Sequence, residues 1–180
     1  EITNKDLPKF QTIDEVNTWR KQKQSDFHRM LGIDHYLEKE RTPLNVRRTG
    51  VLQRDGYTIE KIYFESLPGM YVTGNLYIPN QLTEKAPAIV YLCGHSPTQK
   101  VQYQQHPRRF VQLGFVTLIL DTIQLGEVYG VHHGTYSHQM YEWVSKGYTT
   151  AAPEVWNAIR GLDLLADRKS TRLNSSHTQK

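Results

Sequence analysis

The hydrophobic residues of the first half of the chain follow a helical pattern and then a strand pattern. Residues 12–31 carry apolar side chains at helical spacing, and Thr12 and Glu15 form the capping box typical of a helix start. Gly32 is placed to end that helix. Three runs rich in β-branched and aromatic residues follow and predict an antiparallel meander, because only short DG and LPG turns separate them. Their sequences are VRRTGVLQR, YTIEKIYFES and MYVTGNLYIP.

The pattern changes after residue 85. Residues 86–93 and 115–120 are continuous apolar runs, typical of strands buried on both faces. Residues 103–114 between them can form a short helix with Pro107 in its first turn. A strand–helix–strand order predicts a right-handed crossover and parallel pairing. A last helix is predicted from near Pro153, and its apolar face stops at Ala166. We therefore expect an α/β fold.

The segment from residue 122 to residue 150 is long, irregular and rich in aromatic residues, which favours a functional loop over a disordered one. Its candidate substrate-pocket residues are His132, His133, Tyr136 and Trp143. Zinc ligation by His132, His133 and His138 is the alternative, since imidazole is a good zinc ligand. No carboxylate or cysteine stands at a fixed spacing from these histidines, so we expect no metal.

Charge, hydropathy and cysteine content say little about the binding partners and the cellular compartment of the protein. The net charge is +4, but residues from Asp167 onward contribute +3 of it, so no nucleic-acid partner is expected. No apolar run approaches the roughly 20 residues that span a bilayer, so no membrane partner is expected either. The single Cys93 cannot form an internal disulfide and leaves the compartment open. The oligomeric state is also open.

Several segments together resemble the N-terminal half of α/β-hydrolases of the acetyl xylan esterase type, over about residues 12–166. They are the stretch from RTPLNV to NLYIP, then YLCGHS, LGFVTLILDTIQLGE, HHGTY and GYTTAAPEVWNAIRGLDLL. The resemblance implies a partial α/β-hydrolase fold: an N-terminal helix, an antiparallel β-meander and a parallel βαβ unit, truncated before the nucleophile elbow. It implies a serine ester hydrolase that deacetylates carbohydrate such as xylan through an acyl-enzyme, needs no cofactor and acts on a small or oligosaccharide ester. A secreted or periplasmic location is compatible with it.

The resemblance also assigns residues within the chain. Gly94, His95 and Ser96 stand where α/β-hydrolases supply one oxyanion-hole N–H. Asp121 follows the second buried strand and is expected to position loops or substrate rather than to serve as the triad acid. Ser96 as the nucleophile is the weaker alternative, because Pro97 prevents a helix from starting directly behind it. No G-x-S-x-G occurs in the chain, so the Ser, Asp and His of the triad are expected beyond its end.

The C-terminal stretch DRKSTRLNSSH resembles one reading frame of a common DNA-sequencing adapter. We therefore expect an incomplete gene sequence of metagenomic type, divided into a helical segment 1–45, an incomplete hydrolase domain 46–166 and a non-native, disordered tail 167–180. A disordered natural tail is the alternative. The fragment itself is predicted to be inactive. The rival functions are a non-catalytic carbohydrate-binding relative that uses the aromatic loop, and a dienelactone hydrolase-like or peptidase-like enzyme.

Overall fold

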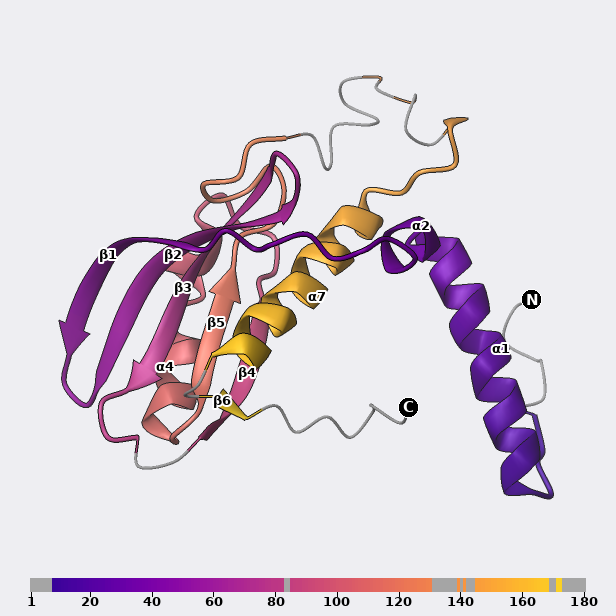
Figure 1. Cartoon of the computed structure of the whole chain (residues 1–180), viewed down its shortest axis with the longest axis horizontal. Helices are drawn as coiled ribbons and strands as arrows, with labels where there is room; N and C mark the ends of the chain where they lie inside the picture. Colours follow the sequence, from indigo (N-terminus) through magenta and orange to yellow (C-terminus); the bar gives the residue numbers. More distant parts are fainter. Residues whose placement is uncertain are drawn as a thin grey trace.

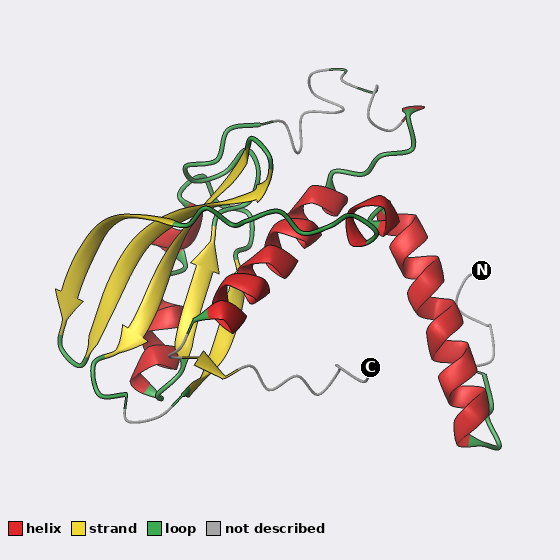
Figure 2. Ribbon diagram, in the orientation of Figure 1, coloured by secondary structure: helices red, strands yellow, loops and turns green. Residues whose placement is uncertain are grey.

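The computed structural model describes residues 8–82, 85–130, 139, 141, 145–168 and 171–172. Within these residues one mixed sheet has the strand order β1-β2-β3-β5-β4-β6 (Figures 1 and 2). The strands are β1 Arg47–Arg54, β2 Tyr57–Leu67, β3 Met70–Pro79, β4 Ala86–Leu92, β5 Val116–Leu120 and β6 Thr171–Arg172. The helices are α1 Ile13–Leu31, α2 Asp34–Leu37, α3 Gln99–Gln102, α4 Gln105–Gln112 and α7 Ala151–Asp167.

The first three strands form the expected antiparallel meander. The β1–β2 turn places Arg54 opposite Tyr57, and β2 pairs with β3 along almost its whole length. Gly56 and Gly69 stand in the two turns with φ near +78° and +77°, a conformation that suits glycine. Side chains along most of β2 alternate between buried and half-buried positions, as in a strand with one face on a core.

Strand β5 lies between β3 and β4, antiparallel to the first and parallel to the second. The predicted parallel pairing of β4 and β5 is therefore confirmed; the connection contains the expected helix as α4 and also the short α3, which the sequence did not predict. All five residues of β5 are buried, as its apolar run predicts. Most of β4 is only half-buried, because the strand on its other side is the two-residue β6, which pairs only with Ala86 and Pro87.

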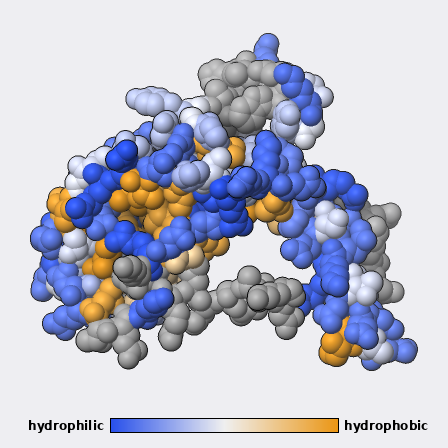
Figure 3. Space-filling model, in the orientation of Figure 1, coloured by the Kyte–Doolittle hydropathy of each residue, from blue (hydrophilic) through white to orange (hydrophobic). Residues whose placement is uncertain are grey.

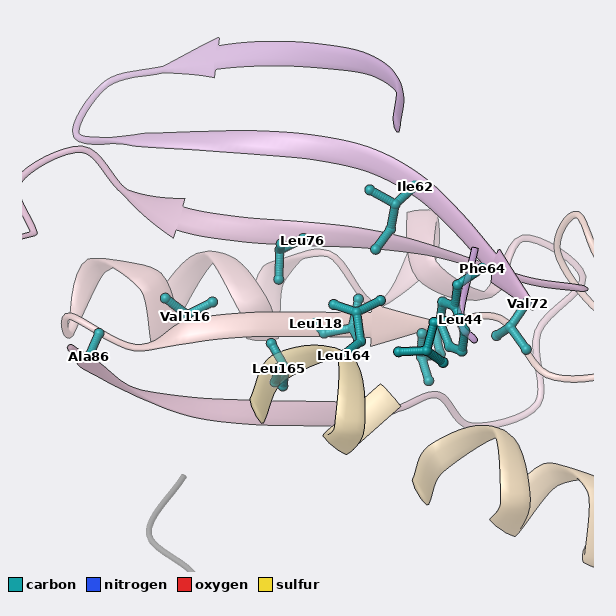
Figure 4. Packing of buried hydrophobic residues seen from close by; sticks show 11 residues of the cluster. Leu44, Ile62, Phe64, Val72, Leu76, Ala86, Val116, Leu118, Leu164 and Leu165 are labelled. Atoms are coloured by element: carbon teal, nitrogen blue, oxygen red, sulfur yellow. The ribbon is translucent and has the colours of Figure 1, made fainter. Parts of the chain in front are cut away.

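Helices cover the two faces of the sheet. Helix α7 crosses one face in front of β4 and β5, and α4 lies behind the sheet against β3 and β5 (Figure 1). The Trp156 indole N–H donates to the Ser66 carbonyl at 2.9 Å and ties α7 to β2. The core under α7 gathers side chains from the 42–45 segment, four strands and the helix (Figure 4). It consists of Leu44, Ile62, Phe64, Val72, Leu76, Ala86, Val116, Leu118, Leu120, Leu164 and Leu165.

Helix α1 confirms its sequence signals at both ends. The Thr12 hydroxyl accepts from the Glu15 N–H at 3.2 Å, the Glu15 carboxylate accepts from the Thr12 N–H, and Gly32 ends the helix at φ +70°. The helix extends away from the sheet, and none of its residues is buried (Figure 1). Figure 3 shows a largely hydrophilic surface along it, whereas hydrophobic side chains gather over the sheet beside α7.

The expected segment boundaries remain predictions. Ile33 and Leu44, from the segment 1–45, are both buried, and Leu44 packs in the core under α7 with residues of the sheet. Of the tail, Arg168 contacts Glu60 at 3.1 Å and β6 extends the sheet, while residues 169–170 and 173–180 lie outside the described part. None of the described helices combines the length and the apolar character needed to cross a membrane.

Candidate active site

The carboxyl ends of β4 and β5 meet at one edge of the sheet because the two strands are parallel. The loop after β4, with Gly94 and His95, lines a cavity of about 190 Å³ there. Thr122 and Leu125 from the loop after β5 line it too, as does Glu154 from the first turn of α7. The first two oxyanion-hole candidates thus lie at the edge where open α/β folds bind ligands. Their role remains a prediction.

Gly94 allows this loop to pass close to a neighbouring side chain. A Cβ atom at residue 94 would lie 2.6 Å from the Tyr103 hydroxyl, nearer than real Cβ atoms approach. The buried Gln99 donates from Nε2 to the Gly94 carbonyl at 2.8 Å, and its Oε1 accepts from the Thr122 N–H at 3.0 Å. One side chain therefore holds both loops of the cavity together.

Ser96, the third candidate, is buried, with 3% of its surface exposed. Its hydroxyl donates to Gln102 Oε1 and accepts from the Thr98 backbone N–H at 3.2 Å. These contacts stabilise the turn into α3. They hold Ser96 in the framework of this loop, and whether Ser96 could act as a nucleophile stays a prediction.

Asp121 is the centre of a buried polar cluster beside this edge. Its Oδ2 accepts from the Thr73 hydroxyl at 2.8 Å and from the Glu127 N–H at 3.1 Å, and its Oδ1 accepts from the Lys100 N–H at 3.1 Å. The Lys100 ammonium pairs with Asp121 and also contacts Glu127 at 2.6 Å. A buried carboxylate needs such partners, because it is costly without them. Asp121 therefore ties the loop after β5 to β3 and α3.

Gly126 lets the loop after β5 wrap round that carboxylate. Its φ is +63°, and a Cβ atom there would lie 2.3 Å from Asp121 Cγ. The Gly126 N–H also donates to the Pro97 carbonyl at 3.1 Å, which connects the two loops a second time. Glycine is required at residue 126 for two reasons, the left-handed backbone and the missing space.

Two titratable groups of the cavity have shifted pKa values. Burial raises the pKa of Glu154 to about 7, so its carboxyl is partly protonated near neutral pH. Burial, with a smaller contribution from Asp121, raises the pKa of the Cys93 thiol to about 12. The thiol donates to the Leu120 carbonyl at 3.3 Å, so Cys93 remains neutral and a poor nucleophile.

The remaining sequence candidates, His132, His133, Tyr136 and Trp143, lie outside the described residues. Among the residues that the structure does describe, no cluster of three His, Cys, Asp or Glu side chains could hold a metal. Sequence reasoning missed Gln99, Lys100 and Glu154. The first two stand on a four-residue helix without periodicity, and an acid in a first helical turn is common on electrostatic grounds alone.

A mixed sheet with a parallel crossover, helices on both faces and a loop-lined cavity at the carboxyl edge defines an α/β-hydrolase type of architecture. Residues 4–149 match the sequence model of the Abhydrolase family. The chain belongs to this α/β-hydrolase family, and its fold is a partial α/β-hydrolase fold.

Solved structures with the same fold include several esterases. A protein assigned as an acetyl xylan esterase of Bacteroides fragilis has a TM-score of 0.74 and 17% identity, over 92% of this chain and 47% of that one. The methylesterase BT1017 has a TM-score of 0.65 and 25% identity, over 83% and 33%. Acetyl xylan esterase 1 of Thermoanaerobacterium sp. has a TM-score of 0.59 and 12% identity, over 83% and 48%.

The chain thus spans between a third and a half of the length of these three structures. A comparison with curated proteins gives no match.

Proposed function

We propose that the chain is the N-terminal part of a serine ester hydrolase that deacetylates carbohydrate, with its catalytic triad outside these 180 residues. The observation that carries the proposal is the loop at the carboxyl edge of β4, where Gly94 and His95 border a cavity with Thr122 and Glu154. Similarity to two structures named acetyl xylan esterases supports the acetyl ester as the substrate group.

We infer the place of the nucleophile from the resemblance to the family. Members of this fold carry the reactive serine on a G-x-S-x-G turn after the strand that follows α7. The G-x-S-x-G motif is absent from the 180 residues. The serine, the acid and the histidine therefore belong to sequence beyond them.

The catalytic role that we propose for these 180 residues is electrostatic stabilisation of the oxyanion. The backbone N–H of His95 or Ser96 would donate to the oxyanion that forms when the serine attacks the ester carbonyl. A preorganised donor stabilises the transition state more than the substrate, and removing one such donor typically costs about 100- to 1,000-fold in kcat. The buried Gln99 and the fit of Gly94 against Tyr103 hold this loop in place.

The test uses the recovered longer reading frame, assayed on acetylated xylo-oligosaccharides. His95→Pro removes a backbone N–H, and we expect kcat to fall about 100-fold or more with a smaller change in KM. His95→Ala keeps the N–H and is the matched control, with near wild-type kcat. An equal loss in both variants would assign the effect to the imidazole. A longer frame without a G-x-S-x-G serine would refute the hydrolase and leave the carbohydrate-binding relative.

The finer choice of substrate is tested in the same assay. Faster turnover of a lactone or of a peptide than of the acetylated sugar would assign the protein to the dienelactone hydrolase-like or peptidase-like alternatives.

A further inference from the structure

A second, larger cavity lies next to the candidate active site. It measures about 640 Å³, within the range of ligand sites, and it is bounded by α2, the β2–β3 turn, residues 146–149 and the start of α7. Ile123 and Pro153 line it, and their chain neighbours Thr122 and Glu154 line the smaller cavity at the Gly94 loop. The two cavities therefore border adjacent residues of the same two segments.

Aromatic rings form one wall of the larger cavity. Tyr148 is half exposed and meets His35 edge-on at 5.8 Å between ring centroids, and His35 lies 4.0 Å from Tyr36. Trp156 stacks on Tyr36 at 5.7 Å and supports it from the core side. Aromatic faces of this kind bind apolar faces of ring-shaped ligands, because each ring offers a large, rigid contact area at little entropic cost.

This wall is anchored at its base. The Thr149 hydroxyl donates to the Leu31 carbonyl and accepts from the Ala152 N–H at 3.2 Å, so it joins the end of α1 to the start of α7. The backbone carbonyl of Gly147 lies beside Gly32, within ordinary van der Waals reach of a side chain there. Since a fixed site loses less entropy on binding than a flexible one, this anchoring favours a binding role.

The described residues that line the larger cavity carry positive charge. Among the described residues that line the cavity, Lys39 and Lys146 are the charged ones of fixed sign, both are exposed, and neither Asp nor Glu is among them. Two ammonium groups beside aromatic rings suit a ring that also carries a carboxylate, because charge-assisted hydrogen bonds to a carboxylate are stronger than neutral ones. A neutral sugar would use the rings and leave both cations without a ligand group.

We propose that this cavity binds a uronic acid residue of the carbohydrate, stacked on Tyr148 with its carboxylate between Lys39 and Lys146. The inference rests on the proposed hydrolase function and sharpens its substrate: the acetylated sugar is held next to a carboxylated one. The substrate class becomes an acidic oligosaccharide ester, with the ester at the Gly94 loop and the acidic residue in the larger cavity.

Binding to the chain itself tests the proposal without needing a nucleophile. Glucuronosyl-xylotriose and neutral xylotetraose are titrated by calorimetry, and we expect the acidic oligosaccharide to bind roughly five- to tenfold more tightly at low salt. The double variant Lys39→Gln/Lys146→Gln should abolish that preference. Lys9→Gln/Lys85→Gln removes the same charge at exposed residues outside the cavity and should keep it. Tyr148→Ala should weaken both ligands by about tenfold.

Equal affinity for the two oligosaccharides would overturn the proposal, and so would a preference that survives the Lys39→Gln/Lys146→Gln variant. Tight binding of ferulate with the same lysine dependence, together with no oligosaccharide binding, would assign the cavity to aromatic acids. Thermal melts of all variants verify that these exposed substitutions leave the fold intact. A failure to bind leaves the hydrolase proposal standing, whereas a failure of the longer frame to hydrolyse esters leaves the binding result standing.

Discussion

At the scale of single residues, the candidate site depends on one buried carboxylate and the glycine beside it. Asp121 receives hydrogen bonds from β3, α3 and the loop after β5, and Gly126 leaves the space that its carboxylate occupies. The cluster therefore sets the positions of the loops at the cavity before any ligand arrives. Preorganisation of this kind is what an oxyanion site requires.

Gly126→Ala should destabilise the protein more than Gly114→Ala. Both glycines have positive φ, so both variants carry the cost of a left-handed alanine, about 1–2 kcal/mol. A Cβ atom at residue 114 meets nothing within 4 Å, whereas at residue 126 it collides with Asp121. We expect an additional loss of about 1–3 kcal/mol for Gly126→Ala by urea unfolding. Equal losses would show that the loop does not enclose the carboxylate.

Glu154 should make stability depend on pH. Its pKa in the folded state is about 7, above the unfolded value of 4.5, so the folded protein holds its proton more tightly. The free energy of unfolding should therefore fall as pH rises from about 4.5 to about 7. Because the carboxyl is only half-buried, we expect a fall of roughly 1–2 kcal/mol, less than the full shift implies.

Glu154→Gln cannot ionise and should remove that pH dependence, which leaves the variant more stable than the wild type near pH 8. Glu38→Gln, at an exposed residue, is the matched control and should retain the wild-type profile. Urea unfolding at several pH values measures the free energy of unfolding of both variants and of the wild type. A Glu154→Gln profile parallel to that of the wild type would contradict the raised pKa.

At the scale of elements, α7 supports the sheet and α1 does not. Helix α7 buries Trp156, Leu164 and Leu165 against the strands, and Gly161 lets it approach β5 so closely that a Cβ atom would lie 3.1 Å from Leu120. Helix α1 has a complete capping box and buries nothing. Interactions between residues close in the sequence therefore stabilise α1, whereas α7 depends on tertiary packing for most of its stability.

Leu165→Ala should cost about 2–5 kcal/mol of stability, because the side chain is fully buried under α7 and leaves a cavity. Leu162→Ala lies on the same helix, with 43% of the residue exposed. It should change the free energy of unfolding by no more than about 0.5 kcal/mol. Thermal and urea unfolding of the two variants measure the difference. Similar losses from both would mean that α7 packs on the sheet through another face.

At the scale of the whole molecule, the described part has the Gly94 loop at one cavity and an aromatic wall at another, and no G-x-S-x-G motif occurs in the 180 residues. The chain as given should therefore not hydrolyse p-nitrophenyl acetate faster than a heat-denatured sample. Any residual rate should be unchanged in Ser96→Ala, since that hydroxyl is engaged with Gln102 and Thr98. Turnover abolished by Ser96→Ala would place the active site at this serine.

Local patterns in the sequence were sufficient for the longer helices and strands and for the pairing within the meander and between β4 and β5, but not for α2, α3 or the pairing of β3 with β5. The capping box of α1, the glycine turns of the meander and the parallel crossover were all predicted from short stretches, because capping, turn geometry and strand spacing involve neighbouring residues. The position of the CGHS stretch directly after an apolar strand was also enough to expect Gly94 and His95 at the carboxyl edge of the sheet, where they line a cavity.

Only the tertiary structure decided which side chains meet. Lys100 pairs with Asp121 across 21 residues, and Gln99 joins the loops after β4 and β5, contacts that no periodicity indicates. The raised pKa of Glu154 arises from burial beside loops far away in the sequence. Strand β4 has the apolar run of a buried strand and is half-exposed, because burial depends on the neighbours that a strand has in the sheet.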